Sequence, residues 1–191
     1  MKGRESGMPE EAYWNTFFNT TDVLDQFGFP HRPDATAVEF GSGYGTFTLP
    51  IAARTRGAVS ALDIEPNLIE QLKKRAHEEG YTNLQALERD FLEAGTGLGE
   101  STQDAAFIFN LLHIETPIEL LSEAYRVLAP AGKLYVIHWR TDIETPRGPP
   151  LSIRPSPDQC AAWCKATGFK VLENTPLGPS APYHYGLIAH R

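Results

Sequence analysis

The chain has 191 residues, of which 41% are hydrophobic, so it can bury one substantial core but is short for two full domains. Its 17 Lys and Arg residues stand against 24 Asp and Glu residues, and the formal charge of −7 argues against a nucleic-acid partner. No apolar stretch approaches the roughly 20 residues that cross a bilayer, so we expect a soluble cytoplasmic protein that does not bind membranes. Cys160 and Cys164 fit neither a disulfide framework nor a complete metal site, and we expect no metal.

An aromatic segment precedes the first predicted strand. Residues 9–27 begin with a proline and two acids, as helices often do, and place Trp14, Phe17 and Phe18 at spacings of three and four. This pattern predicts one aromatic helix before the first strand, and contact of its aromatic side chains with the core is one interpretation of it.

A glycine-rich loop follows, in the segment VEFGSGYG over residues 38–45. A dinucleotide-binding fingerprint needs glycines at relative positions one, three and six, but counting from Gly41 the sixth position is Thr46. Glu39 would repel a pyrophosphate and would favour a cationic group through charge pairing. The loop therefore predicts a ligand that carries positive charge.

Short apolar runs and amphipathic helices alternate through the middle of the chain. Pro66 stands where a first helical turn tolerates proline, and Gly80 ends that helix. Such alternation indicates a mostly parallel sheet that is covered by helices on both faces. The predicted strands lie at 59–63, 84–88, 104–110 and 133–138, and the predicted helices lie at 66–79 and 116–128.

The C-terminal part departs from this alternation. Residues 141–157 contain five prolines, too many for a helix or strand interior, so they predict a loop beside the strand ends. Ser156 begins a predicted helix that Gly168 ends. Predicted strands at 169–173 and 183–190 are joined by a turn too short for a helical crossover, so we expect them to be antiparallel.

Three acids stand in or just after successive predicted strands. Glu39 belongs to the first strand, Asp90 follows the third, and Asp63 ends the second. Asp63 comes 22 residues after Gly41, close to the spacing of roughly 20 residues at which an acid binds a ribose. Because open α/β sheets bind ligands at the carboxyl ends of their strands, the three acids suit a ligand with a cationic centre, a ribose and an exocyclic amine. S-adenosylmethionine has all three.

From about residue 35 onward the chain resembles the class I S-adenosylmethionine-dependent methyltransferases of the small single-domain type. The segments VEFGSGYG, LDIEP, ERDF, IFNLLH and RVLAPAGKLYVIHW carry the resemblance, in the family's order. It implies an α/β fold with a Rossmann-like, doubly wound, seven-stranded sheet, mostly parallel with an antiparallel last strand and helices on both faces. It also implies one domain, with a helical lid over residues 1–34, a cofactor-binding core over 35–140, and a substrate-side loop, helix and strands over 141–191.

The resemblance places S-adenosylmethionine at the strand ends. Glu39 and the glycine loop would hold its methionine end, Asp63 its ribose hydroxyls, and Asp90 its adenine amino group. Asp90 has a second interpretation as a turn cap, and Asp63 also precedes the helix that begins at Pro66, a role compatible with ribose binding. The full set of expected cofactor residues is Glu39, Phe40, Gly41, Ser42, Gly43, Tyr44, Asp63, Ile64, Asp90, Phe91 and Asn110.

Candidate residues for the methyl acceptor lie in other loops. His113 and His138 are candidate catalytic bases, and hydrogen-bonded histidines of the core are the alternative. Arg154 would pair with a substrate carboxylate or phosphate. The alternative is an exposed arginine that does not bind the substrate. The aromatic helix would roof the pocket, as N-terminal helices do in this family. The expected substrate-binding set is Tyr13, Trp14, Phe17, His113, His138, Arg154, Tyr183 and His184.

The motif after the fourth strand narrows the acceptor class. It reads IFNLLHIE rather than Asn-Pro-Pro-Tyr, which gives little support to DNA bases or protein glutamine as acceptors. The sequence also lacks the metal-binding cluster of catechol methyltransferases and the thiol set of arsenic methyltransferases. Because the chain has no appended domain to grip a macromolecule, we expect a small-molecule acceptor. A protein or RNA methyltransferase, and a non-catalytic protein that binds S-adenosylmethionine, remain as alternatives.

Overall fold

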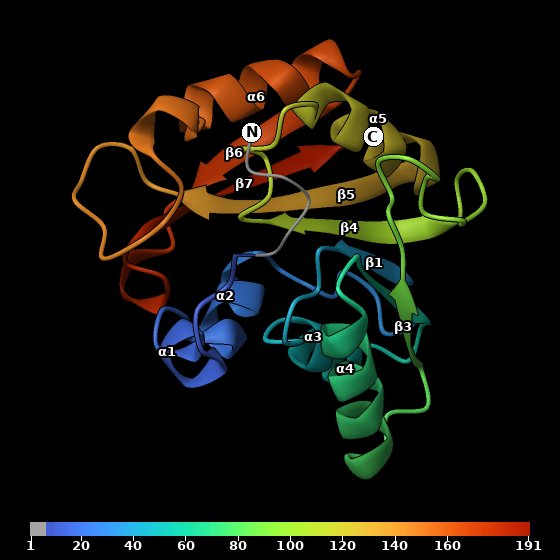
Figure 1. Ribbon diagram of the computed structural model, residues 1–191. Coiled ribbons are helices and arrows are strands. Elements are labelled where there is room, and N and C mark those ends of the chain that lie inside the picture. Colours follow the sequence, from blue (N-terminus) through green and yellow to red (C-terminus); the bar gives the residue numbers. More distant parts are fainter. Residues whose placement is uncertain (1–6) are drawn as a thin grey trace.

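A single seven-stranded sheet forms the centre of the computed structural model, which describes residues 7–191 apart from the side chains of residues 171–173 (Figure 1). The strand order is β3-β2-β1-β4-β5-β7-β6. β7 is antiparallel to both of its neighbours and all other neighbouring strands are parallel, which confirms the predicted fold class. The strands are β1 (Ala37–Phe40), β2 (Val59–Asp63), β3 (Leu84–Glu88), β4 (Gln103–Phe109), β5 (Leu128–Trp139), β6 (Lys170–Thr175) and β7 (His184–His190).

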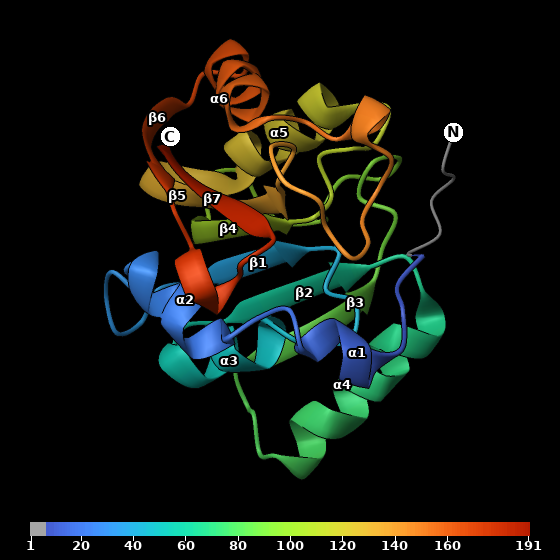
Figure 2. The same cartoon turned by 90° about the vertical axis from the view of Figure 1, so that its left-hand side faces the viewer.

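Helices cover both faces of the sheet (Figure 2). Buried apolar side chains of α5 and α6 form one core cluster with the sheet, whereas α2, α3 and α4 form clusters on the opposite face. No helix in the part of the chain that the structure describes is long and apolar enough to cross a membrane. The helices are α1 (Glu11–Asn15), α2 (Thr20–Gln26), α3 (Thr48–Arg54), α4 (Pro66–Glu78), α5 (Pro117–Val127) and α6 (Pro157–Ala166), with short 3₁₀ helices η1 (Leu151–Ile153) and η2 (Gly178–Ser180).

The prediction of one helix over residues 9–27 is wrong, because two helices, α1 and α2, occupy this segment. The Thr16 hydroxyl donates to the Tyr13 carbonyl oxygen at 2.7 Å, just past the end of α1. The Asn19 side chain then accepts from the Asp22 amide at 3.2 Å and caps α2. Short polar side chains that hydrogen-bond the local backbone compete with continuous helix, and the aromatic spacing concealed this break.

The strand predicted at 133–138 also begins earlier than expected. β5 starts at Leu128, directly after α5, and pairs with β4 through a register shift between Gln103 and Ala105. Ala131 has φ +65° and lies inside this irregular stretch. The left-handed backbone at this residue therefore interrupts the pairing of β5 without ending the strand.

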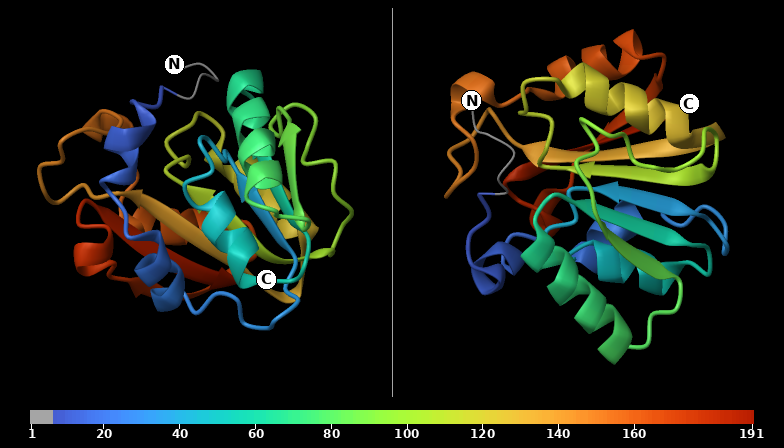
Figure 3. Two further views of the ribbon diagram at one scale, coloured as in Figure 1. Left: turned by 90° about the horizontal axis from the view of Figure 1, so that it is seen from below. Right: turned by 45° about the vertical axis from the view of Figure 1, so that its right-hand side comes forward.

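The connection from β5 to α6 lies next to α1 at one end of the sheet (Figure 3). Arg147 in this connection donates to the Gly7 carbonyl oxygen at 3.0 Å. Trp14 of α1 contacts Trp139 at the end of β5 edge to face, with 6.3 Å between ring centroids. These long-range contacts bring the N-terminal segment over the strand ends, where ligands bind in open α/β sheets.

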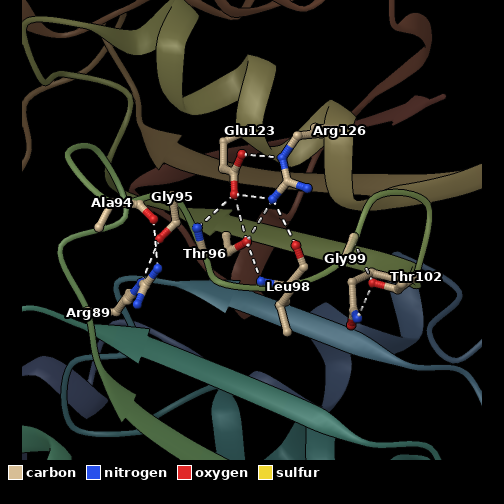
Figure 4. A network of polar contacts seen from close by, with 10 residues as sticks. Arg89, Ala94, Gly95, Thr96, Leu98, Gly99, Thr102, Glu123 and Arg126 are labelled. Atoms are coloured by element: carbon tan, nitrogen blue, oxygen red, sulfur yellow. Dashed lines mark hydrogen bonds and ion pairs between the residues drawn. The ribbon is translucent and has the colours of Figure 1, made fainter.

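A polar network holds the connection from β3 to β4 against α5 (Figure 4). The Glu123 carboxylate accepts from the Thr96 amide and hydroxyl, at 2.7 and 2.6 Å, and from two nitrogens of Arg126, each at 2.7 Å. Burial raises the pKa of Glu123, but the hydrogen bonds from Arg126 and Thr96 outweigh it and bring the pKa down to about 2. The network therefore fixes the segment that follows Asp90.

Candidate active site

A cavity of about 790 Å³ lies at the carboxyl ends of the central strands. It is lined by the glycine loop after β1 and by the residues that directly follow β2, β3 and β4. α1 and the connection from β5 to α6 close its other side. The strand order reverses between β1 and β4, so the cavity occupies the topological switch point of the sheet.

The glycine loop bends sharply away from β1. The amides of Gly41 and Ser42 both donate to the Leu62 carbonyl oxygen, at 2.7 and 2.9 Å, which ties the loop to β2. Gly45 has φ +81°, and a Cβ atom there would lie 2.5 Å from Cδ1 of Leu72. The third glycine of the loop therefore serves close packing against α4, although it does not occupy the position that the dinucleotide fingerprint requires.

Glu39 is a buried acid in the wall of this cavity, with 3% of its surface exposed. Its carboxyl group accepts a hydrogen bond from the Thr48 hydroxyl. Burial raises the pKa of Glu39 to about 8, the Thr48 bond lowers it, and the charge of Asp63 raises it further. A buried acid that is costly to ionise alone favours a cationic ligand, because the ligand's charge would compensate its own.

Two further acids organise the loops around the cavity. Asp63 accepts from the Gly43 amide at 2.7 Å and from the Glu65 amide at 3.0 Å, and burial raises its pKa. Asp90 accepts from the amides of Leu92 and Glu93, both at 3.1 Å. Asp90 therefore caps a turn, which is the second interpretation of this residue.

Two buried polar side chains in the cavity wall lack a hydrogen-bond partner among the described residues. They are the hydroxyl of Ser42 and both atoms of the Asn110 amide. Asn110 also has φ +55°, a conformation that side-chain-bearing residues seldom adopt. Its backbone N–H, in contrast to its side-chain amide, has a partner and donates to the Ile137 carbonyl oxygen at 2.7 Å. Because buried polar groups are almost always paired in native proteins, these groups indicate contacts with a ligand.

His113 and His138 are in contact, with 3.3 Å between Nδ1 of His113 and Nε2 of His138. His113 lines the cavity, whereas His138 has no exposed surface and lies behind it. Burial, and next the neighbouring His113, lowers the pKa of His138 to about 3. His138 is therefore neutral at physiological pH.

Arg154 organises the connection that forms the acceptor side of the cavity. Its guanidinium donates to the carbonyl oxygens of Arg140 and Pro149, at 2.7 and 2.8 Å, and to the Thr145 hydroxyl at 2.9 Å. It also lies 5.9 Å from the centroid of the Trp139 ring. Most of its donors are thus used within the protein, so its main observed role is to shape the wall.

Most of the predicted cofactor residues are brought together in this one cavity. Phe40 and Tyr44 are absent from its lining: Phe40 packs in the core, and the Tyr44 hydroxyl donates to the Pro9 carbonyl oxygen at 2.9 Å. The predicted cofactor residues that line the cavity are Glu39, Gly41, Ser42, Gly43, Asp63, Ile64, Asp90, Phe91 and Asn110.

The predicted substrate residues are divided. Trp14, His113 and Arg154 line the cavity. His184 is buried between Phe18 and Trp139, with ring centroids 4.6 and 4.1 Å away. The predicted substrate residues outside the lining are Tyr13, Phe17, His138, Tyr183 and His184. Lining residues that the sequence did not single out include Phe47, Phe109, Arg147, Ile153 and Trp163.

Comparison with known proteins identifies the family. A family model described as a methyltransferase domain matches residues 37–132, which are 96 of the 191 residues. The chain belongs to this methyltransferase family. An uncharacterized 37.1 kDa protein in transposon TN4556 of Streptomyces fradiae is 31% identical over 140 residues. That match covers 68% of this chain but only 39% of the relative, so the chain spans less than half of that protein's length.

Solved structures show the same fold. A SAM-dependent methyltransferase from Aquifex aeolicus superposes with a TM-score of 0.81 at 22% identity, over 95% of this chain and 93% of that one. Geranyl diphosphate methyltransferase in complex with SAM gives a TM-score of 0.74 at 17% identity, over 95% and 85% of the two chains. The predicted class I methyltransferase is thus confirmed at the level of family and fold, and S-adenosylmethionine is its cofactor.

The residues of the cavity fit this cofactor. S-adenosylmethionine carries two cationic centres, a carboxylate, ribose hydroxyls and an adenine amine, and it therefore needs both acids and neutral hydrogen-bonding groups. The buried carboxyl group of Glu39, the carboxylate of Asp63 and the side-chain amide of Asn110 supply these in one enclosure. When bound, the cofactor supplies an activated methyl group to the acceptor side of the cavity.

Proposed function

We propose that this methyltransferase transfers the methyl group of S-adenosylmethionine to a small-molecule acceptor. The observation that carries the proposal is the single enclosure that the acids Glu39 and Asp63 share with Trp14, His113 and Trp139. Its volume of about 790 Å³ has to hold cofactor and acceptor together, within the range of small-molecule sites of roughly 300–1,000 Å³. Geranyl diphosphate methyltransferase, which shares this fold, has been solved with GPP, and this lends support to a small acceptor.

In this proposal each of the three parts of the chain, residues 1–34, 35–140 and 141–191, has its own role. The segment up to residue 34, whose first six residues lie outside the described part, forms the lid. Residues 35–140 hold the cofactor through the strand-end groups proposed above. Residues 141–191 supply the loop on the acceptor side, where Arg154 braces the wall beside Trp139. Closure from both sides would exclude water and align the acceptor, which is the main contribution that a protein makes to an in-line methyl transfer.

A cytoplasmic location is also part of the proposal. Cys160 and Cys164 are free, buried thiols on α6. Reduced cysteines are the rule in the cytosol, whereas secreted proteins tend to pair them. The thiols themselves pack in the core cluster between α6 and the sheet.

The test begins with isothermal titration of the purified protein with S-adenosylmethionine, S-adenosylhomocysteine and NAD in separate runs. We expect the two adenosyl ligands to bind and NAD not to bind. The next step is incubation with S-adenosylmethionine and a panel of small acceptors, with release of S-adenosylhomocysteine as the readout. Release that depends on a small acceptor supports the proposal. Release only with protein or RNA from cell extract would favour a macromolecular acceptor, and binding without release in any mixture would favour a non-catalytic role.

A further inference from the structure

The groups around His113 and His138 determine which of the two rings donates in the hydrogen bond between them. His138 is fully buried near the end of β5, and its Nδ1 atom lies 3.5 Å from the carbonyl oxygen of Trp139. A carbonyl oxygen only accepts hydrogen bonds, so this contact requires a proton on Nδ1 of His138. Since His138 is neutral, its single ring proton is then on Nδ1, and Nε2 is an acceptor.

This tautomer fixes the proton of His113 as well. Nε2 of His138 lies 3.3 Å from Nδ1 of His113, so His113 has to donate from Nδ1 to close the contact. A neutral His113 then carries no proton on Nε2, the nitrogen on the opposite edge of its ring. The opposite arrangement, with Nε2 of His138 as donor, would set the Nδ1 lone pair of His138 against the Trp139 carbonyl oxygen.

We propose that His138 is a positioning residue that holds His113 in the Nδ1-protonated tautomer, and that Nε2 of His113 is the general base for methyl transfer. This inference rests on the proposed function and narrows the acceptor to a group with a dissociable proton, such as a hydroxyl, a thiol or a protonated amine. His113 follows β4 in the cavity wall and therefore lies where an acceptor would bind. Because His138 lies behind His113, it acts only through it.

His113, with His138 behind it, accounts for the whole proton transfer. Nε2 of His113 takes the proton from the acceptor atom, whose electron pair forms the bond to the methyl carbon. When bound, S-adenosylmethionine supplies that methyl group as its carbon–sulfur bond breaks and leaves the electron pair on sulfur. The resulting His113 imidazolium keeps its Nδ1 hydrogen bond to His138 and later releases the Nε2 proton to water.

The neighbours of His138 keep the proton on His113. Besides His113, the titratable or charged groups near His138 are Arg154, His184 and Tyr185. The Arg154 charge disfavours a cation at His138, and burial lowers the pKa of His184 well below its ordinary value. Burial raises the pKa of Tyr185, whose hydroxyl already donates to the Pro155 carbonyl oxygen at 2.9 Å. Burial and the Arg154 charge therefore both oppose transfer of the Nδ1 proton from His113 to His138.

The tautomer can be measured directly by nuclear magnetic resonance of the full chain with ¹⁵N-labelled histidine. Long-range proton–nitrogen correlations separate protonated from unprotonated ring nitrogens, and single substitutions assign the six histidines. At neutral pH we expect His113 to show a protonated Nδ1 and an unprotonated Nε2. In His138→Phe the Nδ1 proton loses its acceptor, so we expect the nitrogen shifts of His113 to move toward the Nε2-protonated form. His77→Phe, on the exposed side of α4, should leave them unchanged.

Each outcome decides the inference separately from the proposed function. An Nε2-protonated His113 in the unmodified chain would overturn it, and this measurement needs no variant to fold. Unchanged His113 shifts in a folded His138→Phe protein would also overturn it. S-adenosylmethionine titration of the same samples tests cofactor binding independently, since we expect both variants to keep their affinity within about twofold. If an acceptor is identified, His138→Phe should lower turnover and shift the acidic limb of the pH profile.

Discussion

The substitution Glu39→Gln tests the buried acid of the cofactor site most directly. It removes the ionisable group, keeps the side-chain size and leaves an oxygen that can accept from the Thr48 hydroxyl. Burial raises the pKa of Glu39 from an ordinary value of 4.5 to about 8. The ligand-free protein should therefore hold a mostly protonated Glu39 at neutral pH.

The sign and size of the effect follow from linkage. Between pH 4.5 and about 8 the folded chain binds a proton at Glu39 and the unfolded chain does not, so this proton stabilises the folded chain. The stabilisation by the proton is complete below pH 4.5 and is lost as pH rises through 8. The difference between the ordinary pKa of Glu39 and its pKa in the folded chain corresponds to at most about 5 kcal/mol in the free energy of unfolding. In Glu39→Gln this loss is absent, and the variant should gain stability relative to the unmodified protein as pH rises.

Urea unfolding of both proteins at about pH 5 and about pH 9 measures this difference. Groups that titrate in this window and lie away from Glu39 are common to the two proteins, so they cancel when the free energies of unfolding are subtracted. Glu88→Gln is the matched control, because Glu88 is an exposed carboxylate on the edge strand β3. An equal pH dependence in Glu39→Gln and the unmodified protein would refute the buried, protonated carboxyl group.

Cofactor affinity gives the second readout of the same variant. A cationic ligand next to Glu39 would favour the ionised carboxylate, so binding of S-adenosylmethionine should release a proton below pH 8. We expect Glu39→Gln to weaken binding by about 1–3 kcal/mol, the range for one lost hydrogen bond to a charged group. The affinity of the variant should also lose its pH dependence, and titration in buffers of different ionisation enthalpy would detect the missing proton.

Three further predictions follow from single contacts. Asp63→Ala should weaken S-adenosylmethionine binding by about 1–3 kcal/mol in a calorimetric titration, and unchanged affinity would leave Asp63 only the role of tying two loops together. Gly45→Ala should lower the free energy of urea unfolding by about 2 kcal/mol or more, and by more than Gly80→Ala does. Both glycines have positive φ, but only at Gly45 would the new Cβ meet Leu72, so equal losses would contradict the packing argument. Glu123→Gln should cost about 1–3 kcal/mol at neutral pH, and because the pKa of Glu123 is lowered, this deficit should shrink as pH falls from 4.5 to about 2.

The parallel core could be predicted because its signals are local. Continuous apolar runs such as the one at 59–63 are strands because both faces of the sheet are covered, and β2 is buried along its whole length. Pro66 begins α4 as expected, since a helix tolerates proline in its first turn. Once the strands are parallel, Glu39 and Asp63 must approach one edge of the sheet. The cofactor half of the cavity therefore follows from alternation and from residues at strand ends.

The acceptor half could not be predicted in this way, because it depends on contacts between distant segments. Trp139 lines the cavity because Arg154 and the N-terminal Trp14 pack against it. The approach of His138 to His113 depends on the register of β4 against β5, in which Phe109 lies opposite Ile137. No local pattern encodes that register, so the sequence identified both histidines as candidates but not their contact.

The cavity edge also concentrates groups that cost stability in the ligand-free chain. The Ser42 hydroxyl and the Asn110 side-chain amide, which have no hydrogen-bond partner in the part of the chain that the structure describes, each forgo hydrogen bonds, at a cost of about 1–3 kcal/mol per buried group. The left-handed backbone of Asn110 adds strain at the same point. Such costs persist in a fold when a bound partner offsets them. Ligand concentrations of about 100 times Kd should therefore raise the free energy of unfolding by about 2.7 kcal/mol. If these groups do contact the cofactor, Asn110→Ala should reduce that affinity while making the ligand-free protein no less stable.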